Sequence, residues 1–293
     1  MKRQLLAATI FSVGLVSLVA AQEKVQFPST DSDLRGGSPT ELTGYLTRPE
    51  GAGPFPAVVT MHGCDGLVGD DGKVKPLYGV WSGILSQSGY VVIAPDSHGS
   101  RGQGNLCAVP PAERPILSTR EVPRDVYGAL IYLRGRSDVI ADKIAILGQS
   151  AGASAMMNAI TPEMRPKDLS PTQDFHAAVA LYPGCQPFLT RDPPWEPRIP
   201  MMLVIGESDN WTPAADCRAL ITQVSTRGIT IQARYYEGAY HAFDHPNAPV
   251  HDLTNIKVPP DGHAPTVGSN PEARAKATKD VTEFLSATLK PGT

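Results

Sequence analysis

Short apolar runs alternate with segments of helical periodicity along most of this chain. The runs at 56–61 (PAVVTM), 90–94 (YVVIA) and 143–147 (KIAIL) are short and rich in β-branched residues, so we interpret them as buried strands. The segment 124–133 (RDVYGALIYL) spaces its apolar residues three and four apart, as a helix that packs one face does. Continuous apolar strands separated by helices predict an α/β fold with a mostly parallel central sheet and helices on both faces.

The same pattern continues through the rest of the chain. We expect further strands at 41–47, 177–182, 201–205 and 229–236, and helices at 80–88, 151–160, 214–224 and 271–289. The sequence contains no internal repeat and no linker, so we predict a single α/β-hydrolase domain over residues 22–293. Because ligands of such sheets bind beyond the carboxyl ends of the strands, residues that directly follow a strand are the candidates for chemistry.

Residues 1–21 have the pattern of a secretory signal peptide. Lys2 and Arg3 precede an uncharged apolar run from Leu5 to Ala20, which ends in small residues. The alternative is a membrane anchor, but a spanning helix needs about 20 apolar residues, and serine and glycine dilute this run. We predict cleavage after Ala21, a periplasmic or secreted location, and no membrane association of the mature chain.

Charge and cysteine content narrow the possible partners. The net charge is −3 with acids and bases well mixed, which gives no electrostatic basis for binding nucleic acid or a membrane surface. Four cysteines in an oxidising compartment favour two disulfides and allow three pairings. We prefer Cys64–Cys107 and Cys185–Cys217, since each pair would join loops that follow neighbouring strands; buried free thiols are the alternative.

The candidate nucleophile is Ser150, in the pentapeptide GQSAG at 148–152. This G-x-S-x-G pattern follows the strand at 143–147 and opens a helix, as a nucleophile elbow does. The glycines Gly148 and Gly152 would allow a close approach of backbone, and the helix N-terminus favours developing negative charge. The alternative is a glycine–serine turn that only caps the helix.

A serine nucleophile requires a base and an acid, which follow it in that fold in the order acid, then histidine. Asp209 lies in the loop after the strand at 201–205; Glu207 and Asp216 are its rivals. His241 lies in a glycine-led loop after the last strand. The alternatives for His241 are a structural role or a metal site with Asp244, His245 and His251, whose spacing fits no strong zinc pattern. We therefore expect no metal and no cofactor.

The loop after the strand at 56–61 is expected to hold the oxyanion hole. Its sequence at 61–66 is MHGCDG, and in this position a backbone N–H complements that of the residue after the nucleophile. The candidate donors are the amides of Cys64 and Ala151. A bond from Cys64 to Cys107 would stiffen the loop, which suits donors that must be preorganised. We interpret His62 as a structural hydrogen-bonding residue.

The ordered set of motifs resembles the dienelactone hydrolase family of α/β hydrolases. The motifs are HGCDGL, APDSHGSRG, GQSAG, GESDNWTPAADC and GAYHAFD, and they cover most of the mature chain. The resemblance implies a triad of Ser150, Asp209 and His241, with the oxyanion amides at Cys64 and Ala151. It also suggests that Arg101 binds a substrate carboxylate, with a structural or surface guanidinium as the alternative.

Two positions depart from the family pattern. The namesake enzymes have a cysteine nucleophile where this chain has Ser150, and Gly63 replaces their acidic residue beside the oxyanion loop. We therefore expect a serine hydrolase that cleaves carboxylic esters or lactones through an acyl-enzyme, with a small-molecule substrate. The alternatives are a serine peptidase of the same fold and a catalytically silent exported binding protein.

Overall fold

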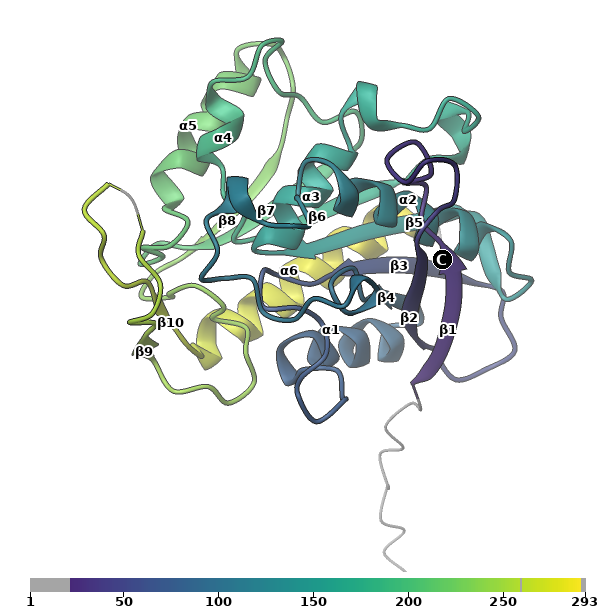
Figure 1. Ribbon diagram of the computed structural model, residues 1–293, viewed down its shortest axis with the longest axis horizontal. Helices are drawn as coiled ribbons and strands as arrows, with labels where there is room; N and C mark the ends of the chain where they lie inside the picture. The colour runs from purple at the N-terminus through teal and green to yellow at the C-terminus, as the bar shows by residue number, and fades with distance from the viewer. Residues whose placement is uncertain (1–21, 259, 291–293) are drawn as a thin grey trace, which may run out of the picture.

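The computed structural model describes residues 22–258 and 260–290, and its centre is an eight-stranded sheet (Figure 1). The strand order is β1-β2-β4-β3-β5-β6-β7-β8, parallel from β4 to β8, with β1 and β2 antiparallel at one edge. The strands are β1 (Glu23–Pro28), β2 (Glu41–Thr47), β3 (Phe55–Met61), β4 (Val91–Pro95), β5 (Val139–Gln149), β6 (Ala177–Leu181), β7 (Met201–Gly206) and β8 (Gln232–Tyr236). The predicted mostly parallel sheet is confirmed.

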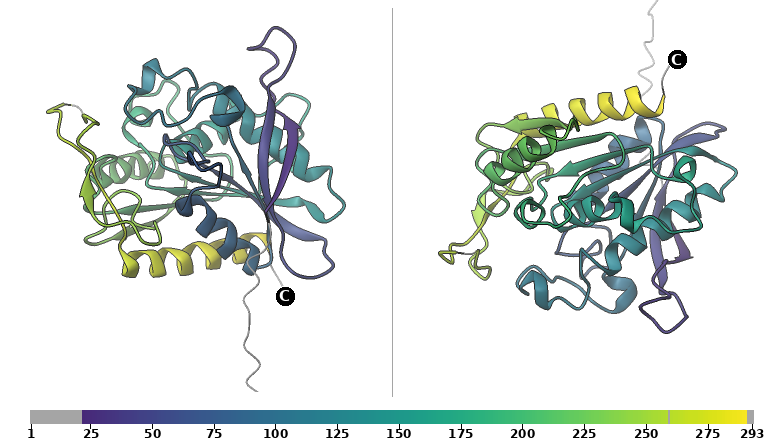
Figure 2. Two further views of the ribbon diagram at one scale, coloured as in Figure 1. Left: turned by 60° about the horizontal axis from the view of Figure 1, so that its bottom comes forward. Right: turned by 90° about the horizontal axis from the view of Figure 1, so that it is seen from above.

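Helices cover both faces of the sheet, as predicted. Helices α1 and α6 lie against one face, and α2 and α3 pack side by side against the other (Figure 2). The helices are α1 (Pro76–Gln87), α2 (Glu121–Arg134), α3 (Ala151–Ala159), α4 (Gln186–Leu189), α5 (Ala214–Ser225) and α6 (Pro271–Leu289), and short 3-10 turns occupy Gly99–Arg101, Pro111–Glu113, Pro162–Met164 and Pro171–Gln173. A small antiparallel pair, β9 (His251–Asp252) and β10 (Thr266–Val267), lies between β8 and α6.

The central strands owe their continuous apolar sequences to this coverage. Every residue of β6 and β7 is buried, and so is all of β3 after Phe55. Full burial of each Val, Leu or Ile side chain contributes about 1.5–3 kcal/mol. The buried sheet therefore supports the loops at its carboxyl edge.

The structure contains α4, β9 and β10, which were not predicted, and β8 begins at Gln232 instead of residue 229. Two further elements also differ from expectation. Strand β1 was not predicted, because only Val25 and Phe27 of its six residues are buried and such a short alternation is a weak signal. Helix α1 begins at Pro76, four residues before the expected start, because proline is favoured in the first turn of a helix. Both differences lie outside the central strands.

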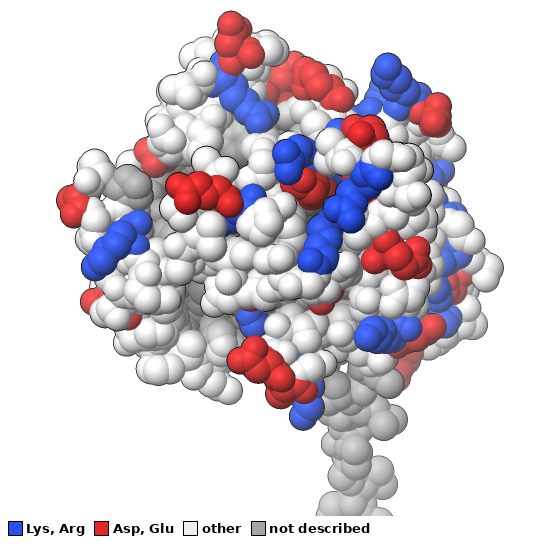
Figure 3. Space-filling view, in the orientation of Figure 1, with Lys and Arg blue, Asp and Glu red and all other residues white. Residues whose placement is uncertain are grey.

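The surface carries charges of both signs. In the orientation of Figure 1, Lys and Arg side chains are interspersed with Asp and Glu over the visible face (Figure 3). Over residues 22–258 and 260–290, no helix has the length and apolar character that crossing a membrane requires. The predicted signal peptide at 1–21 lies outside the described residues.

Candidate active site

Ser150 occupies a sharp turn between β5 and α3. Its backbone has φ 53° and ψ −121°, an unusual conformation for a residue with a side chain. A Cβ on Gly152 would lie 2.3 Å from the carbonyl oxygen of His62, and one on Gly148 would lie 2.5 Å from that of Gly152. Only glycine fits at both positions, so the sequence GQSAG dictates a tight turn that lifts Ser150 above the sheet edge.

A continuous hydrogen-bonded chain links Ser150 to an acid. The distance between His241 Nε2 and Ser150 Oγ is 2.9 Å, and that between His241 Nδ1 and Asp209 Oδ2 is 2.8 Å. Both His241 and Asp209 are buried, whereas Ser150 is partly exposed. The loops after β5, β7 and β8 therefore bring together three side chains that lie far apart in the sequence.

Asp209 is held in a fixed orientation by its own loop. Its Oδ1 accepts hydrogen bonds from the backbone N–H groups of Trp211 and Thr212, both at 2.9 Å. Its Oδ2 accepts from the Thr212 hydroxyl at 3.0 Å as well as facing His241. These four interactions together hold the Asp209 carboxylate in one orientation. The two alternatives to Asp209 lie elsewhere. Glu207 is exposed and pairs with Arg218, and Asp216 lies on α5.

Two aromatic rings that we did not single out from the sequence enclose His241. Tyr182 packs against the imidazole edge-on at 4.7 Å between ring centroids, and Trp211 packs against it at 4.8 Å. Tyr182 directly follows β6 and has φ 42°, so the carboxyl-edge rule applied to the strand at 177–181 could have indicated it. The two rings restrict rotation of the imidazole.

The oxyanion loop after β3 is tied to helix α1. The Gly63 N–H donates to the hydroxyl of Tyr78 at 2.9 Å, and that hydroxyl donates to Asp65. A side chain at position 63 would begin 3.3 Å from the Cβ of Ser150, so Gly63 keeps the space beside the serine open. Among the described residues, the amides of Cys64 and Ala151 have no backbone or side-chain acceptor, and both residues line one small cavity.

Two disulfides anchor loops at this edge. Cys64 is bonded to Cys107, which ties the oxyanion loop to the loop after β4. Cys185 is bonded to Cys217, which ties the loop after β6 to helix α5 beyond the Asp209 loop. This is the pairing that we preferred from the sequence. The bonds lie on opposite sides of the serine turn.

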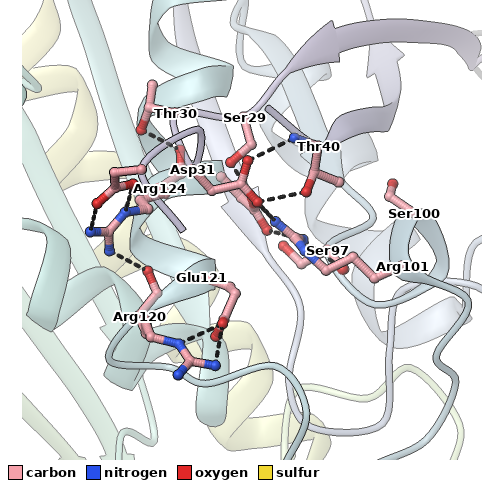
Figure 4. Close-up of polar contacts among 12 residues, drawn as sticks. Ser29, Thr30, Asp31, Thr40, Ser97, Ser100, Arg101, Arg120, Glu121 and Arg124 are labelled. Carbon is pink, nitrogen blue, oxygen red and sulfur yellow. Dashed lines mark hydrogen bonds and ion pairs between the residues drawn. The ribbon is translucent and has the colours of Figure 1, made fainter. Parts of the chain in front are cut away.

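Arg101 has a different environment from the one that a substrate-binding role requires. Its side chain is 8% exposed, and the guanidinium donates two hydrogen bonds of 2.7 Å to Asp125 and one of 2.9 Å to Asp31. Figure 4 shows the Arg101 side chain running into this cluster, where Thr40 also donates to Asp31 at 2.7 Å through its backbone amide. The structure thus matches the alternative interpretation of Arg101, a structural guanidinium, because its donors already face two buried carboxylates.

A second arginine, Arg114, which was not predicted from the sequence, lies near Cys64 and Ala151. Arg114 lines the same small cavity as Cys64 and Ala151, and its Nε donates to the carbonyl of Val109 at 3.0 Å. No carboxylate lies within ion-pair distance of it among the described residues, and burial alone lowers the pKa of its guanidinium. Nothing in its local sequence distinguishes it from a surface arginine, so only the folded chain indicates it.

The residues of the proposed metal alternative have other partners. Both ring nitrogens of His241 face Ser150 and Asp209, Asp244 accepts from three donors, and His251 is exposed. Over residues 22–258 and 260–290, no cluster of three His, Cys, Asp or Glu side chains could hold a metal ion.

His62 is part of a buried imidazole pair next to the oxyanion loop. Its ring lies edge-on to that of His98 at 4.7 Å between centroids. The Nδ1–H groups donate to backbone carbonyls, His62 to Gly63 at 2.8 Å and His98 to Gly104 at 2.9 Å. Desolvation, followed by the charge of His62, lowers the pKa of His98 to about 3, and desolvation also lowers that of His62.

A mostly parallel sheet with a serine turn after its central strand β5, and an acid and a histidine after later strands, places this protein among the α/β hydrolases. The sequence profile of the Dienelactone hydrolase family matches residues 42–289. The chain belongs to the dienelactone hydrolase family, and it is a hydrolase that acts on ester bonds.

Individual relatives agree with this assignment. The chain is 25% identical over 211 residues to a probable 2-oxo-3-(5-oxofuran-2-ylidene)propanoate lactonase of a Bradyrhizobium species, which covers 68% of this chain and 77% of the relative. Among solved structures, a dienelactone hydrolase-like promiscuous phosphotriesterase from metagenomic libraries has a TM-score of 0.64 at 18% identity, over 92% of this chain and 99% of its own.

Similar folds also occur within larger proteins. The acylaminoacyl peptidase of Pyrococcus horikoshii has a TM-score of 0.64 at 18% identity and covers 94% of this chain, but the chain spans only 43% of that protein. Esterase 2 of Thermogutta terrifontis has a TM-score of 0.60 at 18% identity over 96% of this chain and all of its own. At these identities the structural matches describe the fold alone.

Proposed function

We propose that the protein is a serine hydrolase that cleaves carboxylic esters or lactones through an acyl-enzyme intermediate. The observation that carries this proposal is the chain of two short contacts, 2.9 Å from Ser150 to His241 and 2.8 Å from His241 to Asp209. A neutral serine hydroxyl becomes a nucleophile when a neighbouring base takes its proton as it attacks. His241 lies at the distance that such a transfer requires.

The geometry supports a two-step reaction. In the first step the Ser150 oxygen bonds to the substrate carbonyl carbon, His241 takes the serine proton, and the negative charge passes to the carbonyl oxygen. The amides of Cys64 and Ala151 are the donors for that oxygen. The alcohol then leaves with the proton from His241, and a water molecule, activated by the same imidazole, releases the acid and restores the serine. Asp209 keeps the Nδ1 proton in place and stabilises the imidazolium.

Arg114 extends the proposal to the charge of the substrate. It is the cation that lines the cavity shared with the amides of Cys64 and Ala151, whereas both Nη atoms of Arg101 donate to the buried carboxylates of Asp31 and Asp125. The Bradyrhizobium relative is named for a propanoate, which is a carboxylate. We propose that Arg114, in place of Arg101, favours ester or lactone substrates that carry a negative charge near the scissile bond.

We also propose that the mature chain begins after Ala21 and works in the periplasm or outside the cell. All four cysteines are paired, and disulfides persist mainly in oxidising compartments. The single domain predicted over residues 22–293 is consistent with one hydrophobic core cluster that includes residues from β1 to α6.

The test of the reaction is labelling by a fluorophosphonate probe together with turnover of p-nitrophenyl esters, lactones and peptide amides. We expect labelling and ester turnover in the wild type and in Ser225→Ala, an exposed serine of α5. In Ser150→Ala labelling should vanish and kcat should fall roughly 10⁴-fold or more. Ester turnover that persists in Ser150→Ala would overturn the proposal. Faster cleavage of amides would favour the peptidase alternative, and no labelling of the wild type would favour a silent binding protein.

A further inference from the structure

A fourth polar side chain behind the proposed triad has no part in the reaction as described above. Asp244 is 1% exposed and lies three residues after His241. Its Oδ2 accepts hydrogen bonds from Trp81 Nε1 at 2.6 Å and from Gln149 Nε2 at 3.0 Å. Its Oδ1 accepts from the Tyr182 hydroxyl at 2.8 Å. The carboxylate is thus fully engaged by three donors from three separate segments.

The donor set fits an ionised carboxylate. Indole N–H and amide NH₂ groups can only donate, so Oδ2 of Asp244 cannot itself carry a proton. Burial raises the pKa of Asp244, and the hydrogen bonds from Trp81 and Tyr182 and the charge of His241 lower it only in part, so the net shift is upward. No lysine or arginine pairs with Asp244 among the described residues. A buried carboxylate without a cation is costly, and hydrogen bonds offset that cost only in part.

Each donor belongs to a segment that shapes the site. Gln149 immediately precedes Ser150, and its Nε2 also donates to the Tyr182 hydroxyl at 2.9 Å. The ring of Tyr182 packs edge-on against His241 at 4.7 Å. Asp244 therefore fixes the residue before the nucleophile and the ring that bounds the base.

The third donor connects the network to the oxyanion loop. Trp81 lies on α1, one turn after Tyr78, and both side chains are buried. The hydroxyl of Tyr78 holds the Gly63 N–H, and the charge of Asp244 is among the causes that raise the pKa of Tyr78. Helix α1 thus braces the oxyanion loop and the His241 loop at once.

We propose that Asp244 is a positioning residue for the hydrolytic reaction. It orients Ser150 through Gln149 and His241 through Tyr182, and its negative charge adds to that of Asp209 in stabilising the imidazolium. This inference rests on the proposed serine mechanism. The titratable groups of this network beside His241 are Asp209, Asp244 and Tyr182, of which Asp209 and Asp244 are the carboxylates.

The test compares Asp244→Asn with Asp244→Ala in p-nitrophenyl ester hydrolysis across about pH 5 to 9, where a histidine base titrates. Asparagine keeps an acceptor for Trp81 and Gln149 but removes the charge. We expect kcat to fall roughly tenfold in Asp244→Asn, with KM nearly unchanged and the acid-limb midpoint of kcat/KM lower by about 0.5 pH unit. In Asp244→Ala kcat should fall roughly 100-fold, because the nucleophile and base lose their supports.

Matched variants separate positioning from general destabilisation. Asp174 is a buried carboxylate that pairs with Arg198. It lies just before β6, at the amino ends of the strands and away from the candidate site. Asp174→Asn should lower stability without moving the acid-limb midpoint. Tyr182→Phe keeps the ring against His241 but removes one donor to Asp244, and it should lower kcat about threefold even if the Asp244 variants fail to fold.

Ser150→Ala, measured in parallel, distinguishes two kinds of failure. If Ser150→Ala is inactive while Asp244→Asn matches the wild type in kcat and in midpoint, the inference on Asp244 is wrong and the serine mechanism stands. Wild-type kcat in Tyr182→Phe would likewise overturn it. If Ser150→Ala retains activity, the proposed mechanism is wrong and the inference falls with it.

Discussion

Two clusters of polar side chains follow strands of the same sheet, one around Arg101 after β4 and one around Ser150 after β5, and they differ in how much they are exposed. Arg101, after β4, has its charged donors directed at Asp125 and Asp31, which are buried with it. Ser150, after β5, is hydrogen-bonded to His241, and its residue is partly exposed to solvent. The first cluster is closed, because its one guanidinium and two carboxylates pair with one another and are shielded from solvent. The second is open, because it leaves the Ser150 hydroxyl and two backbone amides for another molecule.

The comparison shows that residue type and position after a strand do not identify a functional group. Both clusters contain buried aspartates that accept three or more hydrogen bonds. The difference is one of exposure: the charged side chains of the first cluster are 8% exposed or less, whereas Ser150 is partly exposed. We therefore expect changes in the open cluster to affect rate and changes in the closed cluster to affect stability.

The largest effect is expected for Asp209→Asn in the open cluster. An amide at this position favours the wrong tautomer of His241 and cannot stabilise the imidazolium, so kcat should fall roughly 10³- to 10⁴-fold with the fold retained. Steady-state kinetics and thermal unfolding measured on one preparation give both quantities. A kcat within tenfold of the wild type would mean that the cluster is not a catalytic relay.

Arg101→Met should produce the reverse pattern. Removal of the guanidinium leaves Asp31 and Asp125 buried without a cation, which should lower the free energy of unfolding by about 3–5 kcal/mol. Once corrected for the folded fraction, kcat and KM for neutral and anionic esters should stay within about twofold of the wild type. Urea unfolding and kinetics provide the check. A selective rise in KM for anionic esters would indicate that Arg101 binds the substrate.

The histidine pair beside the oxyanion loop is a second closed cluster, and its effect depends on pH. The pKa of His98 is lowered to about 3, so below about pH 6.5 the unfolded chain binds a proton that the folded chain does not. Stability should therefore be lost as the pH falls from 6.5 towards 3, by about 2 kcal/mol between pH 7 and pH 5. Urea unfolding at both pH values should show a smaller loss in His98→Asn, whose amide can still donate to Gly104. An equal loss would assign the acid sensitivity to other groups.

The smallest effect is expected for Arg114→Gln, which removes the cation that lines the cavity shared with Cys64 and Ala151. We expect KM for an ester with a carboxylate near the scissile bond to rise about fivefold to tenfold, a difference of about 1 kcal/mol. KM for a neutral ester of the same size should not change. Equal changes for both esters would show that Arg114 only supports the loop.

The sequence predicted strands β2 to β8 of the sheet and the three side chains Ser150, Asp209 and His241, which the structure places in one hydrogen-bonded chain. The strands at 177–181 and 201–206 are apolar throughout because helices cover them on both sides, and that produces a clear signal. Ser150, Asp209 and His241 each lie in a short loop after such a strand. The structure brings them together, and their catalytic roles remain a proposal.

The partners of these residues could not be predicted in the same way. Arg101 meets Asp31 and Asp125 at sequence separations of 70 and 24 residues, and no local pattern links them. Asp244 was considered only as a metal ligand, since its donors Trp81 and Gln149 lie 163 and 95 residues away. Contacts at such separations depend on how loops pack, which periodicity does not encode.

The two disulfides have a consequence for how inhibition of this protein should be interpreted. None of its cysteines is free, so alkylating reagents should leave the intact protein unaffected. A reducing agent, in contrast, would release the backbone segment that presents the Cys64 amide and could slow turnover without touching any reacting atom. Sensitivity to dithiothreitol would then indicate that the loop containing Cys64 has become more mobile. It should not be mistaken for evidence of a thiol nucleophile.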